Sequence, residues 1–156
     1  MKVLLAIDDS EPSQVATRMV IEQVVPGKTE VRVLNVVRPP TLLVAREMVG
    51  YDPALENRWE LQLEAATNMV ENLCERLRAN GVKASSSIEI GEPRAKILEV
   101  ADKWHADLIV MGSDRRTRLT EYLPGGIPEA VARRAHCSIE IVRAPQEETK
   151  RKGLNS

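Results

Sequence analysis

Apolar and polar positions along the 156-residue chain follow two alternating periods. Short continuous apolar runs are typical of strands that are buried on both faces of a parallel sheet. Between these runs, apolar residues recur every three or four positions, as they do on one face of a helix. The runs predict five strands, at residues 3–7, 31–37, 82–90, 107–111 and 138–142. This order of elements is typical of a single α/β domain whose helices cover both faces of a parallel sheet.

Four helices are predicted between these strands. The first follows Ser10, an N-cap type of residue, and ends near Pro26-Gly27, and the second ends at Asn80-Gly81. The third starts at Gly91-Glu92-Pro93, and a short fourth helix is opened by Pro128. Residues 38–58 hold no period and contain four turn formers, so we expect a long surface excursion there. Residues 144–156 are polar, which predicts a C-terminal tail after a domain at 1–143.

Strict alternation of strands and helices implies right-handed crossovers and a doubly wound sheet. Such sheets bind ligands beyond the carboxyl ends of their strands, at the point where the strand order reverses. We therefore expect the informative residues to be Asp8, Val36 and the loop that follows Met111.

Charge and hydropathy limit the partners of the chain. It has 22 basic and 23 acidic residues and a net charge of −1, so no excess of cations is available for a nucleic acid or an anionic membrane. The apolar run from Val3 to Ile7 is too short for a signal sequence or a membrane span. We expect a cytoplasmic protein, in which Cys74 and Cys137 are reduced thiols.

The sequence holds none of the common hydrolase motifs, whether the phosphate-binding loop of nucleoside triphosphatases, the serine elbow or the zinc-protease helix. No convergent nucleophile accompanies His105 or His136, so both are interpreted as surface or helix-end residues. Asp8 either caps a turn or a ribose hydroxyl, or belongs to a metal site with Asp9; we favour the first. The scattered aromatic residues argue against a flavin-binding electron carrier. We expect a binding module without catalytic or metal-binding residues rather than an enzyme.

Several segments together resemble the universal stress protein family over residues 1–143. They are Gly91-Glu92-Pro93, Ile97-Leu98-Glu99 and residues 106–113, with 6–11 near the start and His136-Cys137 before the last strand. The resemblance implies an adenine nucleotide alpha hydrolase-like fold, with strand order 3-2-1-4-5, and a role in the stress response. It also implies a homodimer formed through the last strand, here Ser138 to Arg143. That strand is apolar and at a sheet edge, which favours pairing, although Glu140 and Arg143 would soften an unpaired edge.

In the nucleotide-binding branch of this family, a loop with the pattern Gly-x2-Gly-x9-Gly-(Ser/Thr) wraps the phosphates of ATP. The resemblance implies that Asp8 and Val36 border the adenine and ribose, and that the loop and its neighbours border the rest of the nucleotide. Those residues are Met111, Gly112, Arg115, Gly125, Gly126 and Ile127.

The loop matches the family pattern in length but not in content. Gly112 and Gly125 match two of the glycines, whereas Arg115 replaces the second glycine and Gly126 replaces the Ser/Thr. A Cβ at position 115 obstructs close approach of the backbone to a phosphate, although the backbone N–H of Gly126 remains. The arginines at 115, 116 and 118 either belong to a solvated loop or form a substituted anion site. We expect weak or absent ATP binding; the alternative is an ATP-binding protein with slow or no hydrolysis.

Overall fold

One five-stranded parallel sheet forms the centre of the computed structural model, which describes residues 1–41, 45, 48, 50–113 and 126–145. The strand order is β3-β2-β1-β4-β5, so the predicted fold class and order are confirmed. The strands are β1 (Lys2–Ala6), β2 (Glu30–Val37), β3 (Lys83–Ile90), β4 (Leu108–Ser113) and β5 (Ser138–Arg143). The strand order reverses between β1 and β4, which pair in parallel.

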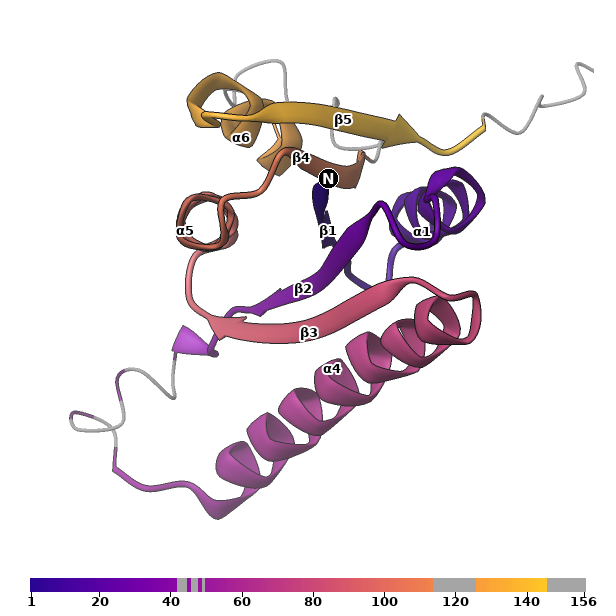
Figure 1. Ribbon diagram of the computed structural model, residues 1–156. Helices are drawn as coiled ribbons and strands as arrows, with labels where there is room; N and C mark the ends of the chain where they lie inside the picture. The colour runs from indigo at the N-terminus through magenta and orange to yellow at the C-terminus, as the bar shows by residue number, and fades with distance from the viewer. Residues whose placement is uncertain (42–44, 46–47, 49, 114–125, 146–156) are drawn as a thin grey trace, which may run out of the picture.

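Helices cover both faces of the sheet (Figure 1). They are α1 (Glu11–Gln23) and α4 (Pro53–Ala79) on one face, and α5 (Pro93–Trp104) and α6 (Ile127–Arg134) on the other. In the part of the chain that the structure describes, no helix is both long and apolar enough to cross a membrane.

The core consists of two apolar layers, one on each face of the sheet. Leu5 of β1 packs in the layer under α1 and α4, and its neighbour Leu4 packs in the layer under α5 and α6. Both side chains are fully buried, because β1 is the central strand and has helices on both sides. This is why the strand has a continuous apolar sequence instead of an alternating one.

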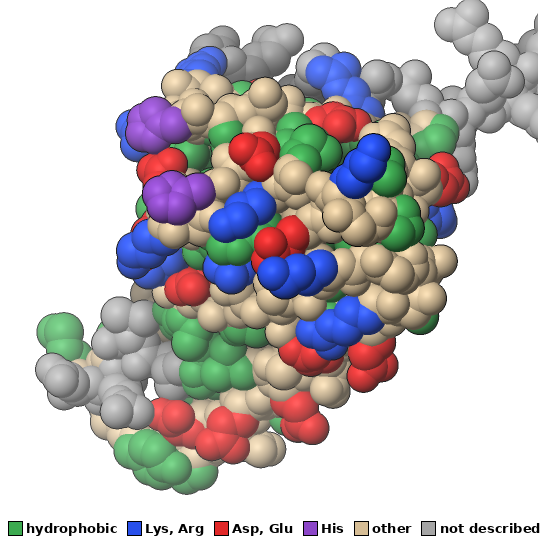
Figure 2. Space-filling model, in the orientation of Figure 1, with side chains coloured by type: hydrophobic (Ala, Val, Ile, Leu, Met, Phe, Trp, Pro, Cys, Tyr) green, Lys and Arg blue, Asp and Glu red, His purple; other side chains and the backbone are tan. Residues whose placement is uncertain are grey.

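The helix ends follow the predicted signals. The Ser10 hydroxyl accepts a hydrogen bond from the N–H of Ser13 (3.4 Å) and caps α1. Gly81 follows the end of α4 with φ +77°, a conformation that suits glycine. His105 takes a left-handed conformation (φ 56°) at the end of α5, as the interpretation of this histidine as a helix-end residue expected. The two histidines of the chain are visible at the surface in Figure 2.

The start of α4 corrects the predicted excursion at 38–58. The helix begins at Pro53 and is capped by Asp52, whose Oδ1 accepts the N–H of Ala54 (3.0 Å). Residues 53–62 are exposed or half-buried, and Leu61 is 57% exposed, so this part of the helix has no buried apolar stripe to signal it. Pro at the first helical position and an Asp cap were the available signals.

The amino-terminal ends of the strands are closed by packing around Trp104. Lys2 Nζ and the Arg32 guanidinium lie 5.3 Å and 4.7 Å from the centre of the Trp104 ring. The backbone N–H of Lys2 donates to Asp107 Oδ2 at 2.7 Å. The main cavity lies at the other end of the strands, where their carboxyl ends meet.

Candidate functional site

A cavity of about 460 Å³ lies at the carboxyl ends of β1, β2 and β4, between the first turns of α5 and α6. It therefore occupies the point where the strand order reverses, as expected for this class of fold. Six of the eight predicted site residues line it: Asp8, Val36, Met111, Gly112, Gly126 and Ile127. The other two, Arg115 and Gly125, lie outside the described residues.

Asp8 belongs to a tight hydrogen-bonded turn between β1 and α1. Its Oδ1 accepts the backbone N–H of Ser10 (2.9 Å), and its own backbone N–H donates to Ser13 Oγ (2.9 Å). The side chain of Asp8 thus caps a turn, which agrees with the favoured interpretation. Within the described residues, no cluster of three or more His, Cys, Asp or Glu side chains could hold a metal ion.

An apolar wall forms part of the cavity. Val36 and Ile97 contribute from β2 and α5, and Met111 and Ile127 contribute from β4 and α6. Val36, Ile97, Met111 and Ile127 all belong to the apolar layer on the α5–α6 face of the sheet. A cavity with apolar walls and a few polar groups is typical of a site for a flat organic ligand such as a nucleobase.

Asn35 fixes the end of β1 beside this wall. Its buried side-chain amide donates to the carbonyl oxygen of Ile7 (2.6 Å), immediately before Asp8. The neighbouring backbone is paired as well, because the N–H of Ile7 donates to the carbonyl of Leu34 (2.8 Å). Asn35 was not predictable as part of the site, because one polar residue inside an apolar strand does not identify its partner.

The first turn of α6 forms another side of the cavity. Gly126 is the N-cap residue, with extended backbone (φ −66°, ψ −177°) and no side chain to accept the helix N–H groups. Glu129 is in the first turn, and a Cβ built on Gly126 would lie 3.0 Å from its Oε2. The helix terminus that would attract an anion therefore already has a carboxylate close to it.

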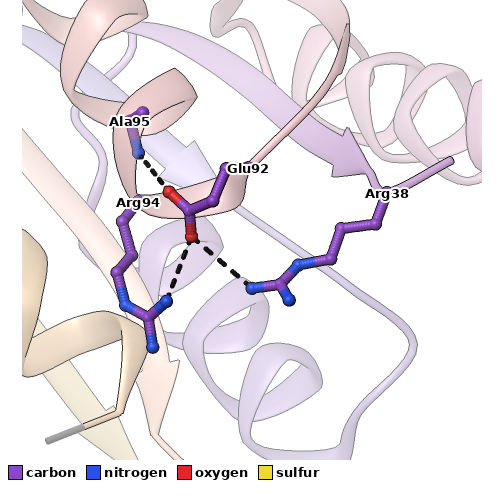
Figure 3. Close-up of polar contacts among 4 residues, drawn as sticks. All are labelled: Arg38, Glu92, Arg94 and Ala95. Atoms are coloured by element: carbon purple, nitrogen blue, oxygen red, sulfur yellow. Dashed lines mark hydrogen bonds and ion pairs between the residues drawn. The ribbon is translucent and has the colours of Figure 1, made fainter. Parts of the chain in front are cut away.

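Two arginines that the sequence analysis did not identify line the cavity opposite Gly126. Arg38 directly follows β2, and Arg94 lies in the first turn of α5. Figure 3 shows both guanidinium groups beside the carboxylate of Glu92, which forms ion pairs with Arg94 (3.1 Å) and Arg38 (3.5 Å). The available signal for Arg38 was its position directly after β2, two residues beyond the predicted site residue Val36.

The two cysteines lie away from the cavity lining and are both unpaired. Desolvation by burial raises the pKa of the Cys74 thiol, with smaller effects from charged neighbours, and burial likewise raises the pKa of Cys137. Both thiols are therefore protonated at neutral pH and weakly nucleophilic.

Comparison with known proteins identifies the family of the chain. The model of the universal stress protein family matches residues 1–143. Universal stress protein YxiE of Bacillus subtilis is 30% identical over 147 residues, which cover 91% of this chain and 98% of that protein. The chain therefore belongs to the universal stress protein family. Universal stress protein MJ0531 of Methanocaldococcus jannaschii is 34% identical over 97 residues, and the match spans 57% of its length and 60% of this chain.

Solved structures share the fold. The structure of protein MJ0577 of M. jannaschii has a TM-score of 0.77 and 26% identity, and the match covers 94% of this chain and 97% of that one. A universal stress protein family member from Arabidopsis thaliana, solved with AMP bound, has a TM-score of 0.64 and 17% identity, with 97% of each chain covered. Adenine nucleotides therefore occur as ligands among the structural neighbours.

Proposed function

We propose that this chain is a regulatory module of the stress response that binds an adenine nucleotide in the cavity between α5 and α6. The observation that carries the proposal is the convergence of Asp8, Val36, Met111, Gly112, Gly126 and Ile127 on one cavity. Those residues come from four separate segments of the chain, and the resemblance to the family implies that they border one ligand. The AMP bound to the Arabidopsis protein supports the ligand class.

We propose further that ATP binds weakly. Gly126 has no hydroxyl to donate to a phosphate, and a Cβ there would lie 3.0 Å from the Glu129 carboxylate, which repels a triphosphate at the start of α6. Arg115 stands where the family pattern has a glycine, so it obstructs approach of a phosphate to the backbone. These features act on the phosphates and leave the apolar wall for the base unchanged.

Isothermal titration with Mg²⁺-ATP, AMP and adenosine tests both proposals. We expect binding of AMP, and a dissociation constant for ATP above about 10 μM, equivalent to about −7 kcal/mol. Tighter ATP binding would favour the alternative, an ATP-binding protein with slow or no hydrolysis. Absence of binding by all three ligands at millimolar concentration contradicts the nucleotide proposal.

A cytoplasmic homodimer through β5 is a further part of the proposal. β5 is the outermost strand next to β4, and Ile139 and Ile141 on it are only half-buried in the single chain. Pairing of two such edges removes unpaired backbone groups from solvent. Light scattering should give twice the mass of 17.4 kDa, and Ile141→Lys should give the single mass. A single mass for the unchanged chain at micromolar concentration contradicts the dimer.

A further inference from the structure

The charges around the cavity are unevenly distributed. Among the described residues that line it, the charged side chains are Asp8, Arg38 and Arg94. Both cations lie where β2 ends and α5 begins, whereas on the α6 side the Glu129 carboxylate lies near Gly126. An anionic group of a ligand is therefore attracted to the β2–α5 side of the cavity and repelled from the α6 side.

Glu92 holds the two guanidinium groups side by side. Arg94 Nη1 and Arg38 Nη2 approach the same carboxylate oxygen, Oε1, at 3.1 Å and 3.5 Å. The other oxygen, Oε2, accepts the backbone N–H of Ala95 at 2.9 Å, which fixes the carboxylate as the N-cap of α5 (Figure 3). The positions of the arginine side chains are thus tied to a backbone position at the start of a helix.

The cluster keeps both positive charge and free donors. One carboxylate between two guanidinium groups leaves a net charge of +1. Each guanidinium has five N–H donors, and within the described residues Glu92 is the hydrogen-bond and ion-pair partner of both arginines. Desolvation raises the pKa of Glu92, but hydrogen bonds from the N–H groups of Ala95 and Arg94 outweigh it and lower the pKa overall. Glu92 is therefore charged at neutral pH, and donors remain for a second anion.

We propose that Arg38 and Arg94 form an anion subsite that binds the phosphate of a nucleoside monophosphate at the β2–α5 side of the cavity. Planar guanidinium groups suit bidentate contacts with phosphate oxygens. Val36 and Ile97 lie beside the subsite in the same cavity and offer an apolar surface to the nucleoside. The nucleoside part rests on the proposed function, whereas the phosphate part rests on the arginine cluster alone. Glu92 acts as a positioning residue for the two arginines.

The affinities of AMP and adenosine separate the phosphate from the rest of the ligand. We expect AMP to bind about tenfold more tightly than adenosine, and Arg94→Gln or Arg38→Gln to remove most of this difference while adenosine affinity stays the same. The matched control is Arg133→Gln, which removes a positive charge from the exposed last turn of α6 and should change neither affinity. Equal binding of AMP and adenosine by the unchanged protein overturns the subsite, as does an equal loss of both affinities in the two arginine variants.

Inorganic phosphate tests the subsite even if no nucleoside binds. In an NMR titration with phosphate, the side-chain Nε–H signals of Arg38 and Arg94, assigned with Arg38→Lys and Arg94→Lys, should shift, and that of Arg133 should not. Glu92→Gln keeps an oxygen for Ala95 but removes the ion pairs of Arg94 Nη1 and Arg38 Nη2, so the Nη–H groups of these two arginines should exchange faster with water while the melting temperature changes little. Phosphate shifts without binding of ATP, AMP or adenosine would leave the phosphate part of the subsite standing and contradict only the nucleotide proposal. No shift at either arginine overturns the subsite.

Discussion

Gly112 and Pro12 are in such close contact that no side chain fits between them. A Cβ built on Gly112 would lie 2.4 Å from the carbonyl carbon of Pro12, 2.5 Å from its oxygen and 2.6 Å from the nitrogen of Ser13. All three atoms belong to the backbone of the first turn of α1, so they cannot move aside as a flexible side chain would. The family pattern implies that this glycine lets a phosphate approach the backbone. The packing of β4 against α1 already requires a glycine at this position.

Gly112→Ala should therefore lower the stability of the fold. We expect the free energy of unfolding in urea to fall by about 1–3 kcal/mol, since overpacking forces the backbone of α1 away from β4. Gly126→Ser, at the Ser/Thr position of the same pattern, is the control for adding a side chain, because only side-chain atoms approach a Cβ there. If the Gly112→Ala protein were as stable as the unchanged chain, the backbone of α1 could move away from β4 without cost, which contradicts this prediction.

Gly126→Ser should add a cap to α6. The backbone at Gly126 is extended, as at most helix N-caps, and Glu129 stands three residues later, so the substitution creates a Ser-x-x-Glu capping box. We expect a gain of a few tenths of a kcal/mol in the free energy of unfolding and tighter ATP binding, because a hydroxyl now faces the cavity. Thermal melting and titration with ATP measure the two effects. Unchanged ATP affinity would mean that the phosphates do not reach this helix terminus.

Glu129→Gln should strengthen ATP binding several-fold, because it removes a negative charge at the start of α6 without shortening the side chain. AMP affinity should stay nearly unchanged if its phosphate lies with Arg38 and Arg94. Titrations with both nucleotides measure the two responses, and Glu64→Gln, on the exposed side of α4, is the control. An equal gain for AMP and ATP would put both ligands' phosphates at α6.

Asn35→Ala should destabilise the cavity wall. The substitution removes the buried hydrogen bond that the Asn35 side-chain amide donates to the carbonyl oxygen of Ile7 at 2.6 Å. We expect the free energy of unfolding to fall by about 1–3 kcal/mol, and further in Asn35→Asp, where a carboxylate would face that carbonyl. Urea denaturation measures both. Equal stability of the Asp and Asn proteins contradicts the assigned direction of this hydrogen bond.

Acid should weaken the Arg38–Glu92–Arg94 cluster. The pKa of Glu92 is lowered in the folded chain, since hydrogen bonds from Ala95 and Arg94 outweigh the opposing effect of desolvation. The carboxylate therefore contributes stability above its unfolded pKa of about 4.5, and that contribution is lost as the pH falls through the lower folded value. In thermal melts below about pH 4.5, Glu92→Gln should lose less stability than the unchanged protein. Parallel curves for the two proteins would contradict this contribution.

The fold was predictable because its signals are local. The continuous apolar run of β1, the Ser10 cap and the Asn80-Gly81 helix end each determine structure within a few residues. The start of α4 was not predictable from periodicity, because the exposed first turns of that helix leave its sequence without an apolar stripe.

The candidate site was predictable only in part. Asp8, Val36 and Gly112 follow strand ends that the topology brings together, so the switch-point rule identified them. Arg94 was missed, because it follows β3, which is distant from the point of reversal in the sheet. The crossover from β3 to β4 carries α5 past β2, which brings its first turn to the cavity, and this placement depends on the strand order rather than on the residue pattern of the helix.

Backbone amide NMR during an AMP titration measures whether an adenine nucleotide occupies the cavity between α5 and α6. A second cavity of about 470 Å³, between α1 and α4, provides an internal control, since Arg18, Met69 and Arg76 line that cavity alone. We expect the largest shifts at Val36, Gly112 and Ile127, with little change at Met69 and Arg76. Shifts confined to the groove between α1 and α4, or none at millimolar AMP, would contradict this expectation.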